Sequence, residues 1–136
     1  MKIATNNFDT NLVIGEGDLG TTYNGFFNDC NGTRFFAIKH MKLEDLRNGV
    51  VFVGQLHHPN LISLIGYYID EGVNILVYEF MVNGNLFTKL HDCLSWKQRL
   101  KICVGVVRAL HYLHFGVKQT IIHGDVKPTN ILLDKN

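Results

Sequence analysis

Three polar residues near the end of the chain have the types and spacing of a catalytic loop. In the stretch HGDVKPTN, Asp125, Lys127 and Asn130 lie between the apolar pair Ile121-Ile122 and the apolar run at 131–133. A carboxylate can accept the proton of a hydroxyl group, a lysine can stabilise the charge of a transferring phosphoryl group, and an asparagine can hold magnesium. The pattern therefore predicts phosphoryl-transfer chemistry, with Asp125 and Asn130 five positions apart.

A glycine-rich stretch, GEGDLG, places Gly15, Gly17 and Gly20 in the pattern G-x-G-x-x-G. Glycines there let backbone N–H groups approach phosphates closely. A dinucleotide-binding turn has the same pattern but needs a helix directly after it, whereas TTYNGFF is rich in the Thr and aromatic residues that favour a strand. The stretch is then either an ordinary glycine-rich hairpin or the phosphate-binding loop that protein kinases place between two strands.

Lys39, in the stretch FAIKH, ends the third predicted strand. A lysine there can reach the phosphates of a nucleotide below a glycine-rich loop, although a lone lysine on a strand is more often a surface residue. The order of the glycine loop, Lys39 and the D-x-x-x-x-N spacing favours a protein kinase, because three such motifs rarely coincide.

The elements that must position these residues divide the chain into a strand-rich half and a helical half. Residues 12–41 predict three antiparallel strands with a hairpin turn at Asn31-Gly32, and residues 61–69 and 73–80 predict two more. Residues 43–56 predict a short, poor helix that Gly49 and Gly54 weaken. The first half is thus expected to be a five-stranded sheet with one helix.

Two helices are expected in the second half, a short one at 85–91 and a long one at 95–116. Ser95 and Gln98 predict a capping box at the start of the long helix, and Gly116 predicts its end. The apolar residues of this helix surround most of its circumference, so it needs burial on several sides. The residues expected to face water or a partner in this chain are Val104, Val106, Val107, Leu110, Leu113 and Phe115.

Length and composition limit the number of domains and the classes of partner that this chain can have. The chain has 136 residues, a net charge of +1 and no basic run, which predicts one domain and argues against a nucleic-acid partner. Three cysteines without metal-type spacing predict free thiols in a reducing compartment. His111 and His114 are three apart on the long helix, but they lack an evident Cys or acidic partner for a metal site. The absence of a signal peptide and of a membrane span predicts a cytoplasmic chain.

The chain resembles the plant receptor-like serine/threonine kinases, in particular the malectin-type (FERONIA-like) receptor kinases. The stretches that carry the resemblance are ATNNFD, LISLIGYYIDE, ILVYEFMVNGNL, LSWKQRLKICVG, ALHYLH and QTIIHGDVKPTNILLD. It implies an α+β, protein-kinase-like fold with a five-stranded antiparallel N-lobe sheet, one short helix and a truncated helical C-lobe. The implied segments are a juxtamembrane-like stretch at 1–7, an N-lobe with hinge at 8–83, and a partial C-lobe at 84–136.

The resemblance also implies a nucleotide site for ATP and Mg²⁺. It makes Tyr78 the gatekeeper before the adenine-binding hinge at Glu79 to Met81, with Asn130 as a weak magnesium ligand. The residues implied to contact ATP are Ile14, Gly15, Gly17, Gly20, Ala37, Lys39, Tyr78, Glu79, Met81 and Leu132. The residues implied to act in catalysis are Asp125, Lys127 and Asn130.

Four departures from the family pattern are expected to weaken this site. Gly124 replaces the arginine before the catalytic aspartate, and Thr22 replaces the valine after the glycine loop. The glutamate partner of Lys39 falls on Gly49, and the nearby acids, Glu44 and Asp45, are a turn or more away. The sequence also contains no Asp-Phe-Gly motif, which predicts a kinase domain that stops before its metal-binding loop.

Three alternatives for the function remain at this point. The chain could be a fragment of an active kinase, a pseudokinase-type module that binds ATP or protein and regulates an intact receptor kinase, or a product without a stable fold. The predicted partners are ATP and, through the exposed long helix, an intact receptor-like kinase or another protein. Family members lie at the plasma membrane with the kinase domain on the cytoplasmic side.

Overall fold

The computed structural model describes residues 2–17, 20–41, 54–70, 73–90 and 94–135. The chain divides into two compact units, one formed by Met1–His57 with Ser63–Phe80 and the other by His58–Ile62 with Met81–Asn136. Most of the helix predicted at 43–56 lies outside the described residues, and its last part, at Gly54 and Gln55, is a turn.

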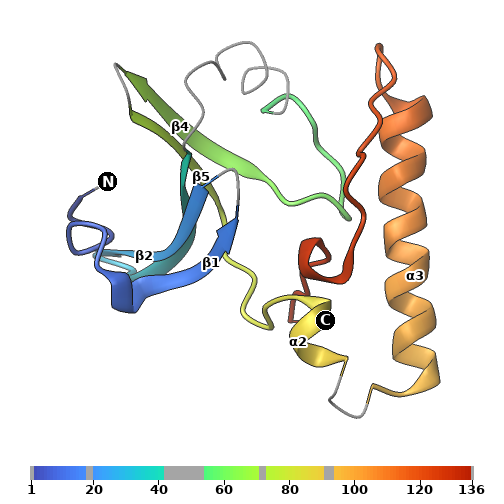
Figure 1. Ribbon diagram of the computed structural model, residues 1–136, viewed down its shortest axis with the longest axis horizontal. Helices are drawn as coiled ribbons and strands as arrows, with labels where there is room; N and C mark the ends of the chain where they lie inside the picture. The colour runs from blue at the N-terminus through green and yellow to red at the C-terminus, as the bar shows by residue number, and fades with distance from the viewer. Residues whose placement is uncertain (1, 18–19, 42–53, 71–72, 91–93, 136) are drawn as a thin grey trace. The chain divides into compact units, whose positions relative to one another are not determined.

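The first unit is a five-stranded antiparallel sheet, as predicted (Figure 1). After a 3-10 turn, η1 (Thr10–Leu12), its strands are β1 (Val13–Gly17), β2 (Gly20–Asp29), β3 (Gly32–Met41), β4 (Leu64–Asp70) and β5 (Val73–Glu79). Their order in the sheet is β1-β2-β3-β5-β4, so β3 lies at the centre with β2 and β5 as neighbours. This central position fixes the backbone of Lys39 on both sides.

The hairpin between β2 and β3 turns one residue earlier than predicted. Asp29 pairs with Gly32, which leaves Cys30 and Asn31 as the turn. The Asp29 carboxylate accepts a hydrogen bond from the Asn31 backbone N–H at 2.8 Å and forms an ion pair with Arg34 at 2.6 Å. Gly32 adopts a φ of +120° as the first residue of β3. The Asp29 side chain therefore stabilises the turn at Cys30 and Asn31, and Gly32 begins the strand that follows it.

Apolar clusters form on both faces of the sheet. Ile38, Ile75 and Val77 are the buried residues of one cluster, against which Ala4, Phe8 and Phe36 pack. The Ala4 carbonyl accepts a hydrogen bond from the Phe26 N–H at 2.9 Å, which ties the N-terminal segment to β2. On the opposite face Met41 and Leu76 are buried, with Leu64, Ile69 and Tyr78 packed around them. The segment before residue 8 thus forms part of the covering of the sheet.

The second unit contains the predicted helices, α2 (Leu86–Lys89) and α3 (Trp96–His111). The predicted capping box is present, since Ser95 Oγ accepts from the Gln98 N–H and Gln98 Oε1 accepts from the Ser95 N–H. A π-helical turn, η2 (Tyr112–Gly116), continues α3 to the predicted end at Gly116. A short 3-10 turn, η3 (Pro128–Asn130), follows in the catalytic loop.

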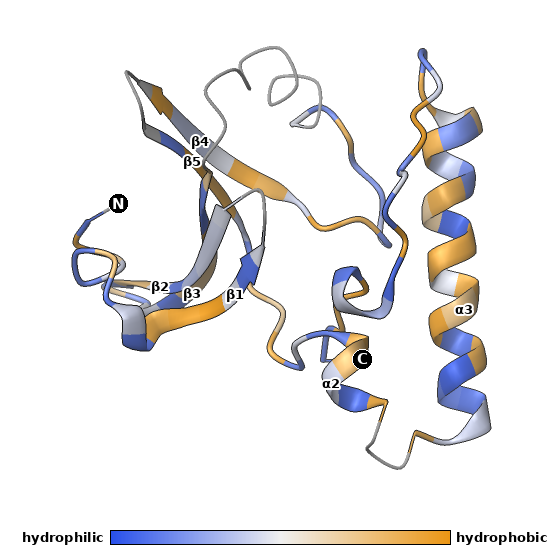
Figure 2. Cartoon of the chain, in the orientation of Figure 1, coloured by the Kyte–Doolittle hydropathy of each residue, from blue (hydrophilic) through white to orange (hydrophobic). Residues whose placement is uncertain are grey.

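Of the six residues predicted to be exposed on the long helix, three are exposed, one is buried, and Val106 and Leu110 are half-buried. Val104, Val107 and Phe115 are exposed, by 47%, 65% and 76% respectively. Leu113 is buried, because the chain folds back and the Ile121 N–H donates to the Leu113 carbonyl at 2.9 Å. Hydrophobic positions recur along the length of α3 in Figure 2. Within the described residues, no helix is both long and apolar enough to span a membrane.

Candidate functional site

The glycines of the predicted phosphate loop differ in what the fold requires of them. Gly20 has a φ of +144°, and a Cβ there would lie 2.1 Å from the His40 carbonyl oxygen, so the pairing of β2 with β3 demands glycine. A Cβ on Gly17 would meet nothing within 4 Å, and one on Gly15 would only touch Thr22 at 4.0 Å. The sheet leaves Gly15 and Gly17 open, as close backbone approach to a phosphate requires.

Lys39 lies in the centre of the sheet, with Thr22 of β2 and Leu76 of β5 as its cross-strand neighbours. Its side chain is half-buried, and the loss of hydration lowers the pKa of its amine from the ordinary lysine value. Among the described residues, no carboxylate lies within ion-pair distance of this amine. Gly49, the predicted position of the glutamate partner, and the nearby acids Glu44 and Asp45 lie outside the described ranges.

The predicted adenine-contacting residues of the first unit lie on strands beside Lys39. Ala37 pairs directly with Tyr78, so both share the face of the sheet that carries Lys39. Burial raises the pKa of the Tyr78 hydroxyl above the ordinary tyrosine value. Ile14 is exposed on β1.

Glu79, the first predicted hinge residue, is tied to the start of β4. The Ser63 backbone N–H donates to Glu79 Oε1 at 2.7 Å, and the Glu79 N–H donates to the Ser63 carbonyl at 3.2 Å. Sequence patterns did not indicate this contact, which joins residues sixteen positions apart. It fixes the backbone at the end of β5.

The catalytic loop in the second unit brings its three predicted residues into one hydrogen-bonded group. The Asp125 carboxylate accepts from Lys127 Nζ at 2.9 Å and from Asn130 Nδ2 at 2.8 Å, both on Oδ2. Asn130 Nδ2 also donates to the Asp125 carbonyl at 2.9 Å. The 3-10 turn η3, which begins at Pro128, lets the chain return Asn130 to Asp125.

These contacts set the charge state of Asp125. The hydrogen bond from Lys127, followed by the one from Asn130, lowers the pKa of the exposed Asp125 carboxyl below its usual value. The carboxylate is therefore charged at neutral pH and can orient a hydroxyl group. Because the Asn130 amide nitrogen is the donor to Asp125, its oxygen stays available as a hard ligand of the kind that Mg²⁺ binds.

The remaining predicted ATP contacts of the second unit lie where two segments run side by side. Leu132 forms an antiparallel bridge with Asn85, and the Leu86 N–H donates to the Ile131 carbonyl at 2.8 Å. The Met81 carbonyl accepts from the Gly84 N–H at 3.1 Å in the preceding turn. The bridge anchors the end of the catalytic loop, and with it Leu132, to the start of α2.

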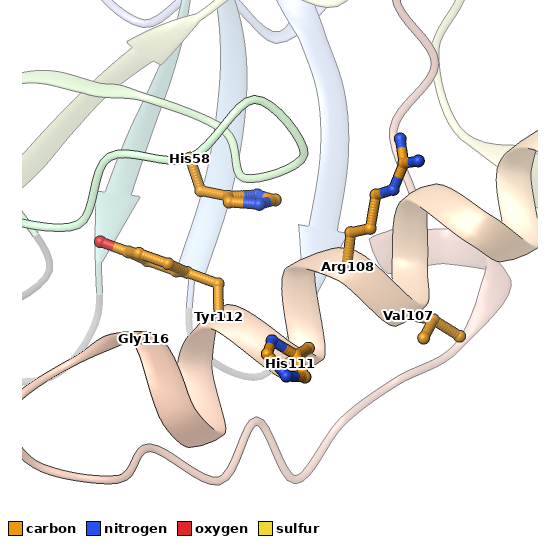
Figure 3. A pocket seen from close by; sticks show the side chains of 6 residues that line it. All are labelled: His58, Val107, Arg108, His111, Tyr112 and Gly116. Atoms are coloured by element: carbon orange, nitrogen blue, oxygen red, sulfur yellow. The ribbon is translucent and has the colours of Figure 1, made fainter.

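A separate hollow of about 420 Å³ lies at the end of α3 (Figure 3). The His58 and Tyr112 rings are stacked at its wall, with centroids 5.0 Å apart. Its other lining residues are Val107, Arg108, His111 and Gly116. None of the predicted site residues lines it. The rings of His111 and His114 both contact Phe115.

Known proteins match the chain along nearly its whole length. The protein kinase domain model matches residues 8–136. From Arabidopsis thaliana, receptor-like protein kinase THESEUS 1 is 46% identical over 98% of this chain and 16% of the relative. Receptor-like protein kinase FERONIA, also from Arabidopsis thaliana, is 43% identical over 99% of this chain and 16% of the relative. The chain thus spans about a sixth of the length of these relatives.

A solved structure shows the same fold. The pseudokinase domain of BIR2, an immune regulator of the RLK/Pelle family, superposes with a TM-score of 0.85 at 32% identity, over 98% of this chain and 44% of that one. These matches point to the same family as the sheet around Lys39 and the hydrogen-bonded loop at Asp125 do. The chain belongs to the protein kinase domain family, and within it to the receptor-like kinases of the malectin type.

Proposed function

We propose that this chain supplies the nucleotide-binding sheet and the catalytic loop of a receptor-like kinase that transfers phosphoryl groups from ATP to Ser/Thr hydroxyls of proteins. The observation that carries the proposal is the charged Asp125 carboxylate, held at 2.9 Å by Lys127 and at 2.8 Å by Asn130. A carboxylate held in this way can orient a hydroxyl group and accept its proton.

Each remaining residue has a role in the proposal that fits its chemistry. Lys127 would stabilise the charge of the transferring group, and the Asn130 oxygen would hold Mg²⁺, which neutralises phosphate charge when bound. Gly15, Gly17 and Lys39 would contact the phosphates. The predicted adenine contacts would come from the hinge backbone and from the side chains of Ile14, Ala37 and Leu132.

A second candidate is a pseudokinase-type module that binds ATP or an intact receptor-like kinase. Two observations favour it: the likeness to the BIR2 pseudokinase domain, and a Lys39 amine without an ion-pair partner in the described residues. The exposed apolar residues of α3, among them Val104 and Val107, would provide the contact with protein. In either role the chain would work on the cytoplasmic side of the plasma membrane.

Calorimetric titration with ATP tests whether the predicted site binds nucleotide. We expect binding that falls by about tenfold or more in Lys39→Ala, which corresponds to roughly 1.4 kcal/mol, while Lys97→Ala on exposed α3 keeps the affinity. Magnesium should increase the affinity only slightly, since the catalytic loop offers one amide oxygen as a ligand. Equal ATP affinity in both lysine variants would refute the proposed site.

A further inference from the structure

The hollow at the end of α3 lies where residues 58–61 rest on that helix. The His58 ring stacks on the Tyr112 ring, with centroids 5.0 Å apart. Two turns earlier on α3, a Cβ on Gly105 would lie 3.2 Å from Asn60 Nδ2, so Asn60 packs directly on the helix backbone. All residues that line the hollow belong to the second unit, so its walls form within that unit.

Arg108 gives the hollow a permanent positive charge. Its side chain is exposed and extends from α3 on the side where the His58 ring lies (Figure 3). Among the described residues, no carboxylate forms an ion pair with Arg108, and no aspartate or glutamate lines the hollow. A guanidinium can donate two parallel hydrogen bonds to a carboxylate. The hollow is therefore complementary in charge to a single carboxylate, whereas a phosphate monoester, with a charge of about −1.5 to −2, would exceed its one permanent cation.

Exposed apolar side chains lie on both sides of this charge along α3. Val107 lies four positions before His111 and Phe115 four positions after it, and both are exposed. Residues four apart share one face of a helix, and the Phe115 ring contacts the His111 ring at a centroid distance of 5.2 Å. The face thus presents an apolar group, a basic group and an apolar group in order.

The length of this face matches an extended peptide. Val107 and Phe115 are eight positions apart, a rise of about 12 Å along a helix. In a strand, residues at i, i+2 and i+4 point to the same side and span about 13 Å. A peptide with the pattern apolar-x-acidic-x-apolar would therefore place its carboxylate over the middle of the face and an apolar side chain at each end.

We propose that the hollow and its flanks bind an extended segment of a protein partner with the pattern apolar-x-acidic-x-apolar. Its carboxylate pairs with Arg108, and its two apolar side chains cover Val107 and Phe115. A small free anion would leave both of these apolar side chains exposed, so the flanks favour a peptide as the occupant. The site uses none of the predicted ATP contacts, so the test gives an answer whether or not the chain binds nucleotide.

Two peptides that differ only in charge test the proposal. Acetyl-Leu-Ser-Glu-Ser-Leu-amide and its Gln counterpart are titrated into the ¹⁵N-labelled chain and followed by proton–nitrogen correlation spectra. We expect both to shift the amides of Arg108, His111, Tyr112 and Gly116, with the Glu peptide binding about two- to fivefold more tightly, as for an exposed ion pair. This comparison uses the unmodified chain and needs no variant to fold.

Matched variants assign the preference to one residue. Arg108→Gln should abolish the preference for the Glu peptide, whereas Lys97→Gln, which also removes one positive charge from α3, should keep it. Lys97 lies eleven positions before Arg108, a rise of about 16 Å, which exceeds the screening length of roughly 10 Å at about 0.1 M salt.

Three results would overturn the proposal. The first is equal affinity for the two peptides, or no shift at the residues that line the hollow. The second is a preference for the Glu peptide that persists in Arg108→Gln. The third is acetate producing the same shifts at the same concentration as the Glu peptide, which would show a site for small free anions and not for a peptide.

Discussion

The two glycines Gly17 and Gly20 should respond to alanine in opposite ways, although they belong to one motif. At Gly20 an alanine Cβ would lie 2.1 Å from the His40 carbonyl oxygen and 2.9 Å from Met41 Cα, at a φ of +144°. The conformation costs about 1–2 kcal/mol for an L-residue, and the forced backbone shift adds about 1–3 kcal/mol. Gly20→Ala should therefore reduce the free energy of unfolding by about 2–5 kcal/mol, a large part of the roughly 5–15 kcal/mol of a typical domain.

Gly17→Ala is the matched control, because its Cβ meets nothing within 4 Å. We expect little change in the free energy of unfolding and weaker ATP binding, since the methyl group would occupy the space that a phosphate needs. Urea unfolding followed by circular dichroism, together with ATP titration, measures both quantities. Two results would contradict this reasoning: Gly20→Ala unfolding at the same urea concentration as the unmodified chain, or Gly17→Ala being destabilised as strongly as Gly20→Ala. Either would show that the fold does not require glycine at position 20 more than at position 17.

Three further predictions concern the second unit. Ser95→Ala should lower the free energy of unfolding by about 0.5–2 kcal/mol, because it removes the N-cap of α3. Lys97→Ala, in the same turn, is the control, and an unchanged thermal midpoint in Ser95→Ala would contradict the prediction. Carbon-detected titration should place the carboxyl pKa of Asp125 below its ordinary value, and Lys127→Ala should raise it. A depressed carboxyl pKa stabilises the fold above the unfolded-state value, and the effect is lost as pH falls through the folded-state value. Lys127→Ala should therefore be slightly less stable than the unmodified chain near neutral pH and equally stable in strong acid; equal titration of Asp125 in both chains would argue against the contact. A polypeptide of these 136 residues has no Asp-Phe-Gly motif, so we expect no transfer of radiolabelled phosphate to a generic protein substrate; turnover that Asp125→Asn abolishes would disprove this.

The parts of the fold that follow from local patterns were predictable from the sequence. The strand-favouring residues and the turn residues within 12–41 indicated three strands, and Ser95 with Gln98 indicated the start of α3; the structure confirms both. The group of Asp125, Lys127 and Asn130 was predicted from residue types and spacing, and the structure brings the side chains of Asp125 and Asn130 within 2.8 Å of each other.

Contacts between distant residues could not be predicted in this way. The tie from Ser63 to Glu79, the packing of Ala4 and Phe8 on the sheet, and the burial of Leu113 all depend on where the chain returns in space. The hydrogen bond from the Asp125 N–H to His123 Nδ1 is local, but it depends on the left-handed φ of Gly124, and a glycine does not by itself indicate which conformation it adopts.

In the proposed function, the residues of the kinase motifs form a nucleotide site in this chain. Proton–nitrogen correlation spectra of the ¹⁵N-labelled chain, recorded with increasing ATP, test for this site residue by residue. We expect shifts at Gly15, Gly17 and Lys39 and at the hinge residues Glu79 and Met81, with Lys97 and the exposed residues of α3 unchanged. In Lys39→Ala the shifts of the glycines and the hinge should be much smaller at the same ATP concentration. Spectra that do not change with ATP, or changes confined to the end of α3 around His58 and Tyr112, would contradict it.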